Sequence, residues 1–235
     1  MTGDFDANTV AANLAAVRTR LAAACRAAQR EADAVQLLAV SKTHPAAAVR
    51  AAHAAGQRLF GENRVQELVA KARELGDLTD LRWHLIGSLQ TNKVRDLLRV
   101  PGLAMVHSLD RVALADELQR ALAPAGRRLE VLLQIHATDE TTKHGCPPAA
   151  AAELLAHVLG RCPALAVCGV MAMGPLVGDA LPVFRAVVAL RDRLRAQFAL
   201  PLATLSLGMS SDAEAAIAAG STLVRLGTAV FGARG

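Results

Sequence analysis

The chain has 235 residues, of which 53% are hydrophobic and 3% aromatic, and its formal net charge is +5. This length and apolar content suit one large domain with a sizeable core. The arginines are dispersed and few aromatic residues accompany them, so the basic balance does not indicate a nucleic-acid partner. No apolar run approaches the length of a membrane span, and no basic segment precedes an apolar stretch near the N-terminus. We therefore expect a cytoplasmic protein without a membrane partner.

A long amphipathic helix is predicted first, over residues 8–32, because apolar residues recur there at helical spacing. Eight short strand-like segments then alternate with helical segments. The predicted strands cover residues 35–40, 58–60, 82–86, 103–107, 129–135, 165–171, 203–207 and 222–226. The predicted helices between them cover residues 46–55, 63–75, 91–99, 110–122, 148–159, 181–197 and 211–219. Glycines stand where we expect helices to end: Gly56, Gly76, Gly126, Gly160 and Gly220.

Alternation of strands and helices predicts a parallel sheet, and eight strands are the number that closes a (β/α)8 barrel of the TIM type. An open doubly wound sheet is the alternative, but no GxGxxG turn follows an early strand. No linker or repeat divides the chain. We interpret residues 1–235 as a single α/β barrel domain, with residues 1–33 forming an extra N-terminal helix that packs on the barrel.

Lys42 is conspicuous because the chain has only four lysines against twenty-two arginines. An arginine cannot become a free amine near neutral pH, whereas a lysine can. Lys42 lies at the polar end of an apolar run, residues 37–43, which makes it a candidate for a Schiff-base amine. A solvated loop lysine is the alternative interpretation.

The last two predicted strands are followed by small polar residues, Ser210 and the pair Gly227-Thr228. Barrels commonly bind phosphate at these two loops, through backbone N–H groups and hydroxyls. Ser210 could instead only cap a helix. Arg225 lies within an apolar strand, so it either pairs with a carboxylate or points into the barrel mouth toward a ligand. A lysine amine, a phosphate site and a strand-borne arginine together match pyridoxal 5′-phosphate (PLP).

Seven short motifs carry a resemblance to a known family. They are VSKT at 40–43, FGEN at 60–63, WHLIG at 83–87, LQTNK at 89–93, GVMAM at 169–173, LSLGMSSD at 205–212 and LVRLGTAVFG at 223–232. From about residue 35 to the C-terminus the chain resembles the pyridoxal phosphate homeostasis proteins, also called proline synthetase co-transcribed homologues. The resemblance implies a fold like the N-terminal domain of alanine racemase, a monomer, and PLP held at the barrel mouth.

The same resemblance implies roles for seven residues. Lys42 would carry the Schiff base, and Arg225 would contact the ring nitrogen of PLP. The other implied contacts are the phosphate ligands Ser210, Gly227 and Thr228 and the more loosely assigned positions Asn63 and Met209. His84 and Lys93 belong to family motifs, but their roles do not follow from the residues.

Three positions depart from the family pattern. Arg64 stands where a tyrosine is usual, Ser88 where a proline is usual, and His136 where asparagine is frequent. These departures affect the packing expected around the ring of PLP and any role of that tyrosine. They leave the lysine and the phosphate loops unaltered.

The family resemblance implies a non-catalytic protein that holds PLP, limits free aldehyde and could deliver the cofactor to apo-enzymes. An amino-acid racemase is the alternative, but such enzymes use a tyrosine opposite the lysine and this chain contains no tyrosine. A sugar-phosphate barrel enzyme would need carboxylate pairs at the strand ends, where only Glu62 fits. The four cysteines lack metal-ligand spacing, and His144 with Cys146 is too small a set to predict a metal site.

Overall fold

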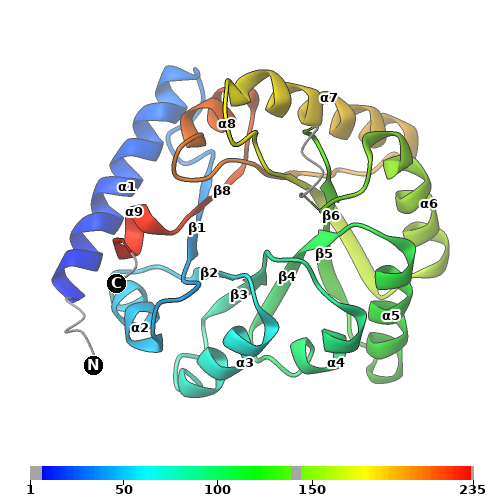
Figure 1. Ribbon diagram of the computed structural model, residues 1–235, viewed down its shortest axis with the longest axis horizontal. Coiled ribbons are helices and arrows are strands. Elements are labelled where there is room, and N and C mark those ends of the chain that lie inside the picture. The colour runs from blue at the N-terminus through cyan, green and yellow to red at the C-terminus, as the bar shows by residue number, and fades with distance from the viewer. Residues whose placement is uncertain (1–6, 139–143, 234–235) are drawn as a thin grey trace.

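The computed structural model describes residues 7–138 and 144–233, which form a closed barrel of eight parallel strands in chain order (Figure 1). The strands are β1 (Gln36–Val40), β2 (Leu59–Glu62), β3 (Arg82–Leu85), β4 (Leu103–Leu109), β5 (Leu129–Ile135), β6 (Leu165–Ala172), β7 (Thr204–Ser206) and β8 (Leu223–Leu226). Leu38 of β1 pairs with Arg225 of β8, and this pairing closes the barrel. The predicted TIM-type barrel is confirmed, and each of the eight predicted strands is present.

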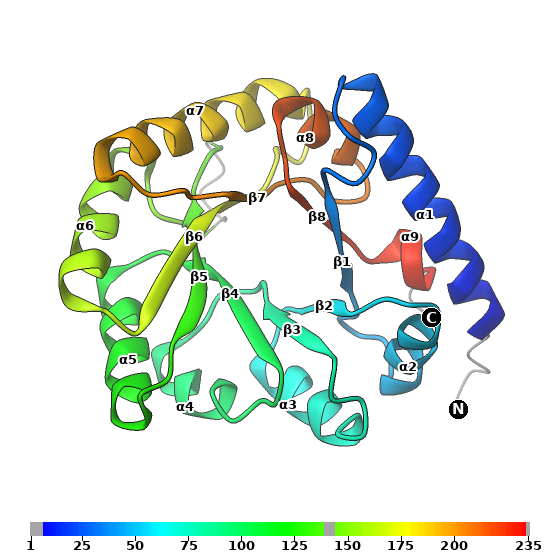
Figure 2. The same ribbon diagram turned by 180° about the vertical axis from the view of Figure 1, so that it is seen from behind.

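Helices form a ring around the strands, which is visible from both sides (Figures 1 and 2). They are α1 (Ala7–Ala27), α2 (Ala46–Ala54), α3 (Val65–Glu74), α4 (Val94–Leu97), α5 (Val112–Leu122), α6 (Ala151–Arg161), α7 (Ala180–Phe198), α8 (Ala213–Ala219) and α9 (Thr228–Phe231). Short 3₁₀ turns at Thr91–Lys93, Ala123–Ala125 and Pro148–Ala150 adjoin α4, α5 and α6. In the described part of the chain, no helix combines the length and apolar character needed to cross a bilayer.

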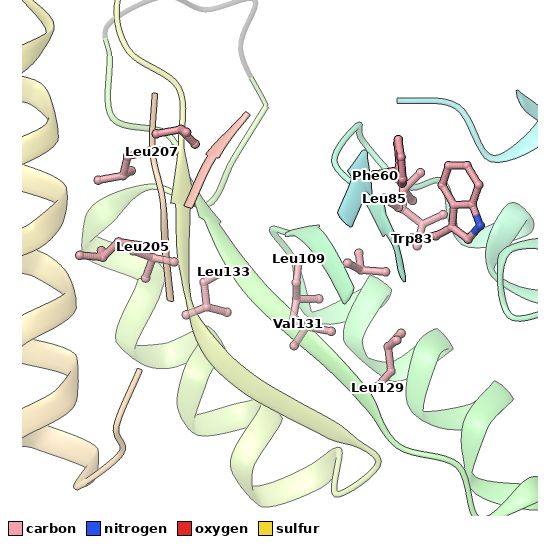
Figure 3. Close-up of a cluster of buried hydrophobic side chains, with 14 of the residues drawn as sticks. Phe60, Trp83, Leu85, Leu109, Leu129, Val131, Leu133, Leu205 and Leu207 are labelled. Atoms are coloured by element: carbon pink, nitrogen blue, oxygen red, sulfur yellow. The ribbon is translucent and has the colours of Figure 1, made fainter. Parts of the chain in front are cut away.

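The main hydrophobic core fills the layer between the strands and the surrounding helices. Successive side chains of a strand point to opposite faces, so Trp83 and Leu85 of β3 point outward into this layer, whereas His84 points into the barrel. Phe60 and Trp83 pack with ring centroids 5.8 Å apart, and Figure 3 shows both within the core. A parallel sheet buried on both faces explains why the strand segments are almost continuously apolar.

The helix α1 lies against α2, α8 and α9 on the outside of the barrel (Figures 1 and 2). It buries one apolar stripe, made of Val10, Leu14, Val17, Leu21 and Cys25. On its polar side, Arg20 forms an ion pair with Glu214 of α8, and Asn13 donates a hydrogen bond to the carbonyl oxygen of Val230. These contacts join the first helix to the last two helices of the chain.

Two helix ends differ from the sequence prediction. The prediction of helix to residue 32 is wrong, because Gln29 adopts a left-handed φ of 56° and ends α1 at Ala27. The amide of Arg30 donates to Cys25 and that of Gln29 to Arg26, which is the Schellman arrangement without its usual glycine. The expected stop at Gly160 is also wrong, because α6 continues to Arg161.

Candidate functional site

A partly open cavity of about 190 Å³ lies at the carboxyl ends of the barrel strands. All seven residues that the sequence analysis singled out line it: Lys42, Asn63, Met209, Ser210, Arg225, Gly227 and Thr228. Its remaining lining residues are Val40, His44, Ile86, Met171 and Met173. The fold thus gathers residues from the two ends of the sequence at the barrel mouth, where such barrels carry their functional groups.

Lys42 follows β1 in a tight turn. The amide of His44 donates to the carbonyl oxygen of Ser41 at 3.0 Å, and Thr43 has a left-handed φ of 67°. A β-turn in which only the third residue has a positive φ is a type II turn. Within residues 7–138 and 144–233, no side chain or carbonyl forms a hydrogen bond or ion pair with the Lys42 amine. The amine at the cavity is therefore available to a ligand.

Arg225 projects from β8 into the barrel and is 5% exposed. Its Nη1 donates to the carbonyl oxygen and, at 2.7 Å, to the hydroxyl of Ser206, and its Nη2 donates to the carbonyl oxygen of Ala172 at 2.9 Å. Burial lowers the pKa of Arg225 to about 10, so it remains a cation at neutral pH. Among the described residues it has no carboxylate ion-pair partner, so the alternative of a structural ion pair is not what the structure shows, and Arg225 lines the cavity.

The loop after β7 turns at Gly208, whose φ is +90° and whose added Cβ would lie 2.6 Å from the Cβ of Ala216. Asp212 then accepts a hydrogen bond from the amide of Met209 at 2.6 Å. Asp212, not Ser210, occupies the N-cap position of α8, so the interpretation of Ser210 as only a helix cap is wrong. The loop instead presents Ser210 to the cavity.

Four residues whose roles the sequence left open or that depart from the family pattern, namely His84, Arg64, Ser88 and Lys93, do not line this cavity. His84 is buried in the barrel and borders a second cavity, which opens at the amino ends of the strands. Arg64, Ser88 and Lys93 line a surface depression that shares Asn63 with the main cavity. Glu62, the one carboxylate expected at a strand end, is fully buried and paired with Lys71 rather than facing the cavity. Among the described residues, no carboxylate lines the cavity, so none of them forms an acid/base pair there.

His44 lines the cavity but was not singled out from the sequence. Its ring packs against Phe231 with centroids 5.2 Å apart. The sequence feature that could have identified His44 as a cavity residue is its position two residues after Lys42, in the turn that follows β1. Because α9 was not predicted, its contact with Phe231 could not be foreseen.

One group of three potential metal ligands lies elsewhere, on α5 and the end of α6. His157 Nε2 is 2.7 Å from an Asp116 oxygen, and the Cys162 sulfur is 3.8 Å from the same oxygen. Burial and the neighbouring Asp116 raise the pKa of the Cys162 thiol, which disfavours the thiolate that metals bind. We interpret these residues as a pair formed by His157 and Asp116, with the buried Cys162 thiol beside it. All four cysteines are free.

Comparison with known proteins identifies the family. The family model for the N-terminal domain of alanine racemase matches residues 12–235. A relative from Pseudomonas aeruginosa named pyridoxal phosphate homeostasis protein is 46% identical over 228 residues, which covers 97% of this chain and 96% of the relative. The chain belongs to the pyridoxal phosphate homeostasis protein family.

A further relative and two solved structures extend this match. The human relative of that name is 39% identical over 234 residues, covering 94% of this chain and 85% of its own. The structure of PipY from Synechococcus elongatus with PLP bound has a TM-score of 0.83 and 40% identity, and covers 95% of this chain and 100% of its own. Alanine racemase from Corynebacterium glutamicum has a TM-score of 0.69 at 16% identity, covering 96% of this chain and 61% of its own, and shares the fold.

Proposed function

We propose that this protein binds PLP reversibly through Lys42, limits the free aldehyde in the cell and supplies the cofactor to apo-enzymes. The observation that carries the proposal is one cavity lined by Lys42, Arg225, Ser210 and Thr228. The PLP-bound structure of its relative PipY supports the same cofactor.

The cavity fits the cofactor in size and chemistry. A cavity of about 150 Å³ accepts a benzene ring, so about 190 Å³ with an open side accommodates a substituted pyridine ring. An arginine has five N–H donors. Three hydrogen bonds anchor the Arg225 guanidinium within the barrel, and its remaining donors can contact a ring nitrogen. The hydroxyls and backbone around Ser210 and Thr228 suit the phosphate.

Bound PLP supplies an aldehyde, and the protein supplies the amine. The Lys42 nitrogen bonds to the aldehyde carbon, and the aldehyde oxygen leaves as water, so hydrolysis reverses the attachment without any redox change. Arg225 stays protonated and donates to the ring nitrogen, which keeps that nitrogen unprotonated. A neutral pyridine is a weak electron sink, so this contact supports a carrier more than an enzyme that stabilises carbanions.

The site of attachment can be tested by trapping. We would add PLP to the apo-protein, reduce with borohydride and locate the modified residue by peptide mass spectrometry. We expect modification of Lys42 in the wild type and none at the cavity in Lys42→Ala. Lys93→Ala, in the neighbouring depression, is the matched control and should retain the Lys42 adduct. An adduct mainly on Lys71, Lys93 or Lys143 would contradict the proposal.

Delivery needs a separate measurement. The PLP-loaded protein is mixed with an apo-enzyme that depends on PLP, and enzyme activity is followed in the presence of an excess of a phosphatase that destroys free PLP. Activation that survives the phosphatase supports direct supply. Activation that disappears with the phosphatase would show that the protein only stores and releases the cofactor.

A further inference from the structure

The turn that carries Lys42 contains a backbone conformation that its sequence does not favour. Thr43 has a φ of 67°, in the region that type II turns reserve for glycine or asparagine. A β-branched side chain at such a φ is strained and persists only when its surroundings hold it. Something outside the turn must therefore stabilise it.

Glu67 on α3 supplies that contact. Its Oε1 accepts a hydrogen bond from the amide of Thr43 at 2.5 Å. In a type I turn, the competing form, the peptide between Lys42 and Thr43 is turned over. The Lys42 carbonyl oxygen would then face the carboxylate in place of the amide. Glu67 therefore selects the type II form.

Lys71, one turn further along α3, holds Glu67 in place. Its ammonium is nearly buried and donates to Glu67 Oε1 at 2.9 Å, to Glu62 Oε1 at 2.6 Å and to the Ser41 carbonyl oxygen at 2.6 Å. All three donors of the ammonium are thus used. The Ser41 hydroxyl also donates to Glu62 at 2.6 Å. The residues on either side of Lys42 are therefore held by hydrogen bonds to one charged cluster, which consists of Glu62, Lys71 and Glu67.

The charge states agree with this geometry. Burial alone would raise the pKa of Glu67, but hydrogen bonds from Lys71 and the Thr43 amide lower it below its usual value. Glu67 is therefore a carboxylate at neutral pH. For Glu62 burial dominates and raises the pKa despite Lys71 and Ser41. Its Oε2 is buried, and none of the residues that the structure describes forms a hydrogen bond with it.

We propose that Glu67, locked by Lys71, is a positioning residue that holds the Ser41–His44 turn in one form and thereby fixes the backbone from which Lys42 reaches the cavity. This inference rests on the proposed function, because it concerns the reactivity of the Lys42 amine. Without the carboxylate the turn exchanges between two forms, and the amine spends less time in reach of a bound aldehyde.

The test uses the rate at which PLP becomes attached to Lys42, trapped by borohydride and quantified by mass spectrometry. We expect Glu67→Ala to slow attachment on the order of tenfold, and Glu67→Gln, which keeps an acceptor oxygen, to slow it less. Thr43→Gly in the Glu67→Ala background should restore the rate, because glycine adopts a positive φ without strain. Asp77→Ala, which removes an exposed carboxylate paired with Arg50 on the outer surface, is the matched control and should react like wild type.

A second readout needs no cofactor. In the apo-protein, amide hydrogen exchange at Thr43 should be slow in the wild type and faster in Glu67→Ala, because the carboxylate protects that amide. If Glu67 had only a structural role, its substitution would lower the melting temperature. The attachment rate measured well below that temperature would then be unchanged.

The outcomes separate the two proposals. If wild type gives no adduct on Lys42, the proposed function fails. If wild type reacts and Glu67→Ala reacts equally fast, the proposed function stands and the positioning role is wrong. If Glu67→Ala slows the attachment of PLP and the added Thr43→Gly substitution does not restore the rate, the positioning role is also wrong. If Glu67→Ala does not fold, the comparison of Glu67→Gln with Glu67→Gln/Thr43→Gly decides in the same way.

Discussion

His107 Nδ1 lies 3.1 Å from the Ser206 hydroxyl in the centre of the barrel, and both residues are fully buried. The same hydroxyl accepts a hydrogen bond from Arg225 at 2.7 Å. The guanidinium can only donate, and among the described residues His107 Nδ1 is the only acceptor within reach of the Ser206 hydroxyl, so we assign the hydroxyl proton to that bond. His107 then carries its proton on Nε2 and donates to His84 Nδ1, 2.9 Å away. A directional chain of hydrogen bonds thus runs from Arg225 through the barrel to His84.

Ser206→Ala should loosen Arg225 and weaken PLP binding. The substitution removes one acceptor of the guanidinium and the donor to His107, while the carbonyl oxygens of residues 206 and 172 remain. A hydrogen bond to a charged group contributes roughly 1.5–3 kcal/mol, so we expect about a tenfold or larger rise in the Kd for PLP. Fluorescence or absorbance titration of the apo-protein measures it.

Ser221→Ala is the matched control for that experiment. Ser221 is also a fully buried serine, and its hydroxyl donates to backbone carbonyl oxygens near β7 and β8, but it does not contact Arg225. We expect it to lower stability without a comparable change in the Kd. Equal PLP affinity in Ser206→Ala and wild type would contradict the role assigned to the chain of hydrogen bonds.

The buried histidine pair predicts a loss of stability in acid. Burial lowers the pKa of His84 to about 4, with Arg82 acting in the same direction, and lowers the pKa of His107 well below its usual value. The unfolded chain binds these protons near pH 6.5 and the folded chain does not. Their contribution is therefore complete above pH 6.5 and declines as the pH falls toward 4, by up to about 1.4 kcal/mol per pH unit for each histidine. Urea unfolding at pH 7, 6 and 5 measures this decline.

Comparison between variants isolates the histidines from other titrating groups. The raised pKa of Glu62 acts in the opposite direction, because its contribution is lost as the pH rises. His84→Asn should make the decline between pH 7 and pH 5 shallower. An unaltered slope in His84→Asn would show that the pair does not titrate as described.

The PLP-loaded protein is expected to leave the α-proton of alanine in place. Racemisation needs acid/base groups on both sides of the bound amino acid, and the chain has no tyrosine to act opposite Lys42. Proton NMR of alanine in deuterated water measures the exchange. Since His44 also lines the cavity, rapid exchange that is lost in His44→Ala would establish a racemase-type proton transfer and overturn the non-catalytic role.

The barrel could be predicted from the sequence because its strands are short apolar runs separated by amphipathic helices. The elements that were missed depend on other information. The end of α1 is set by hydrogen bonds around Gln29, a residue without a strong preference for helix ends. The helix α9 has four residues, too few to show periodicity. The helix α6 continues through Gly160 to Arg161, because the helical pattern of the sequence does not require the helix to end at this glycine.

The cavity residues could also be foreseen, because strand ends meet at one mouth of a barrel. The charged cluster of Glu62, Lys71 and Glu67 next to the Lys42 turn could not be foreseen. In α3, Glu67 and Lys71 have the i,i+4 spacing of an ordinary surface ion pair, and only the packing of α3 against β2 and β3 buries Lys71. The chain of hydrogen bonds from His84 to Arg225 likewise joins four strands, because β3 and β4 supply the histidines and β7 and β8, about a hundred residues later, supply Ser206 and Arg225.

Gly87→Ala should disturb both stability and the cavity. Gly87 follows β3, and a Cβ added there would lie 2.1 Å from the carbonyl oxygen of Asn63, a cavity residue that follows β2. Backbone must move to relieve this contact, and overpacking of this kind costs about 1–3 kcal/mol. We expect a lower free energy of unfolding in urea together with weaker PLP binding, because Asn63 is displaced.

Gly160→Ala is the control for this substitution, because a Cβ at Gly160 meets nothing within 4 Å and the residue lies within α6. Alanine is favoured over glycine in a helix by about 0.5–1 kcal/mol, so this variant should be slightly more stable and bind PLP as the wild type does. If Gly87→Ala loses stability but keeps the wild-type Kd, then Asn63 does not contribute to the cofactor site, and its place in the cavity lining is incidental.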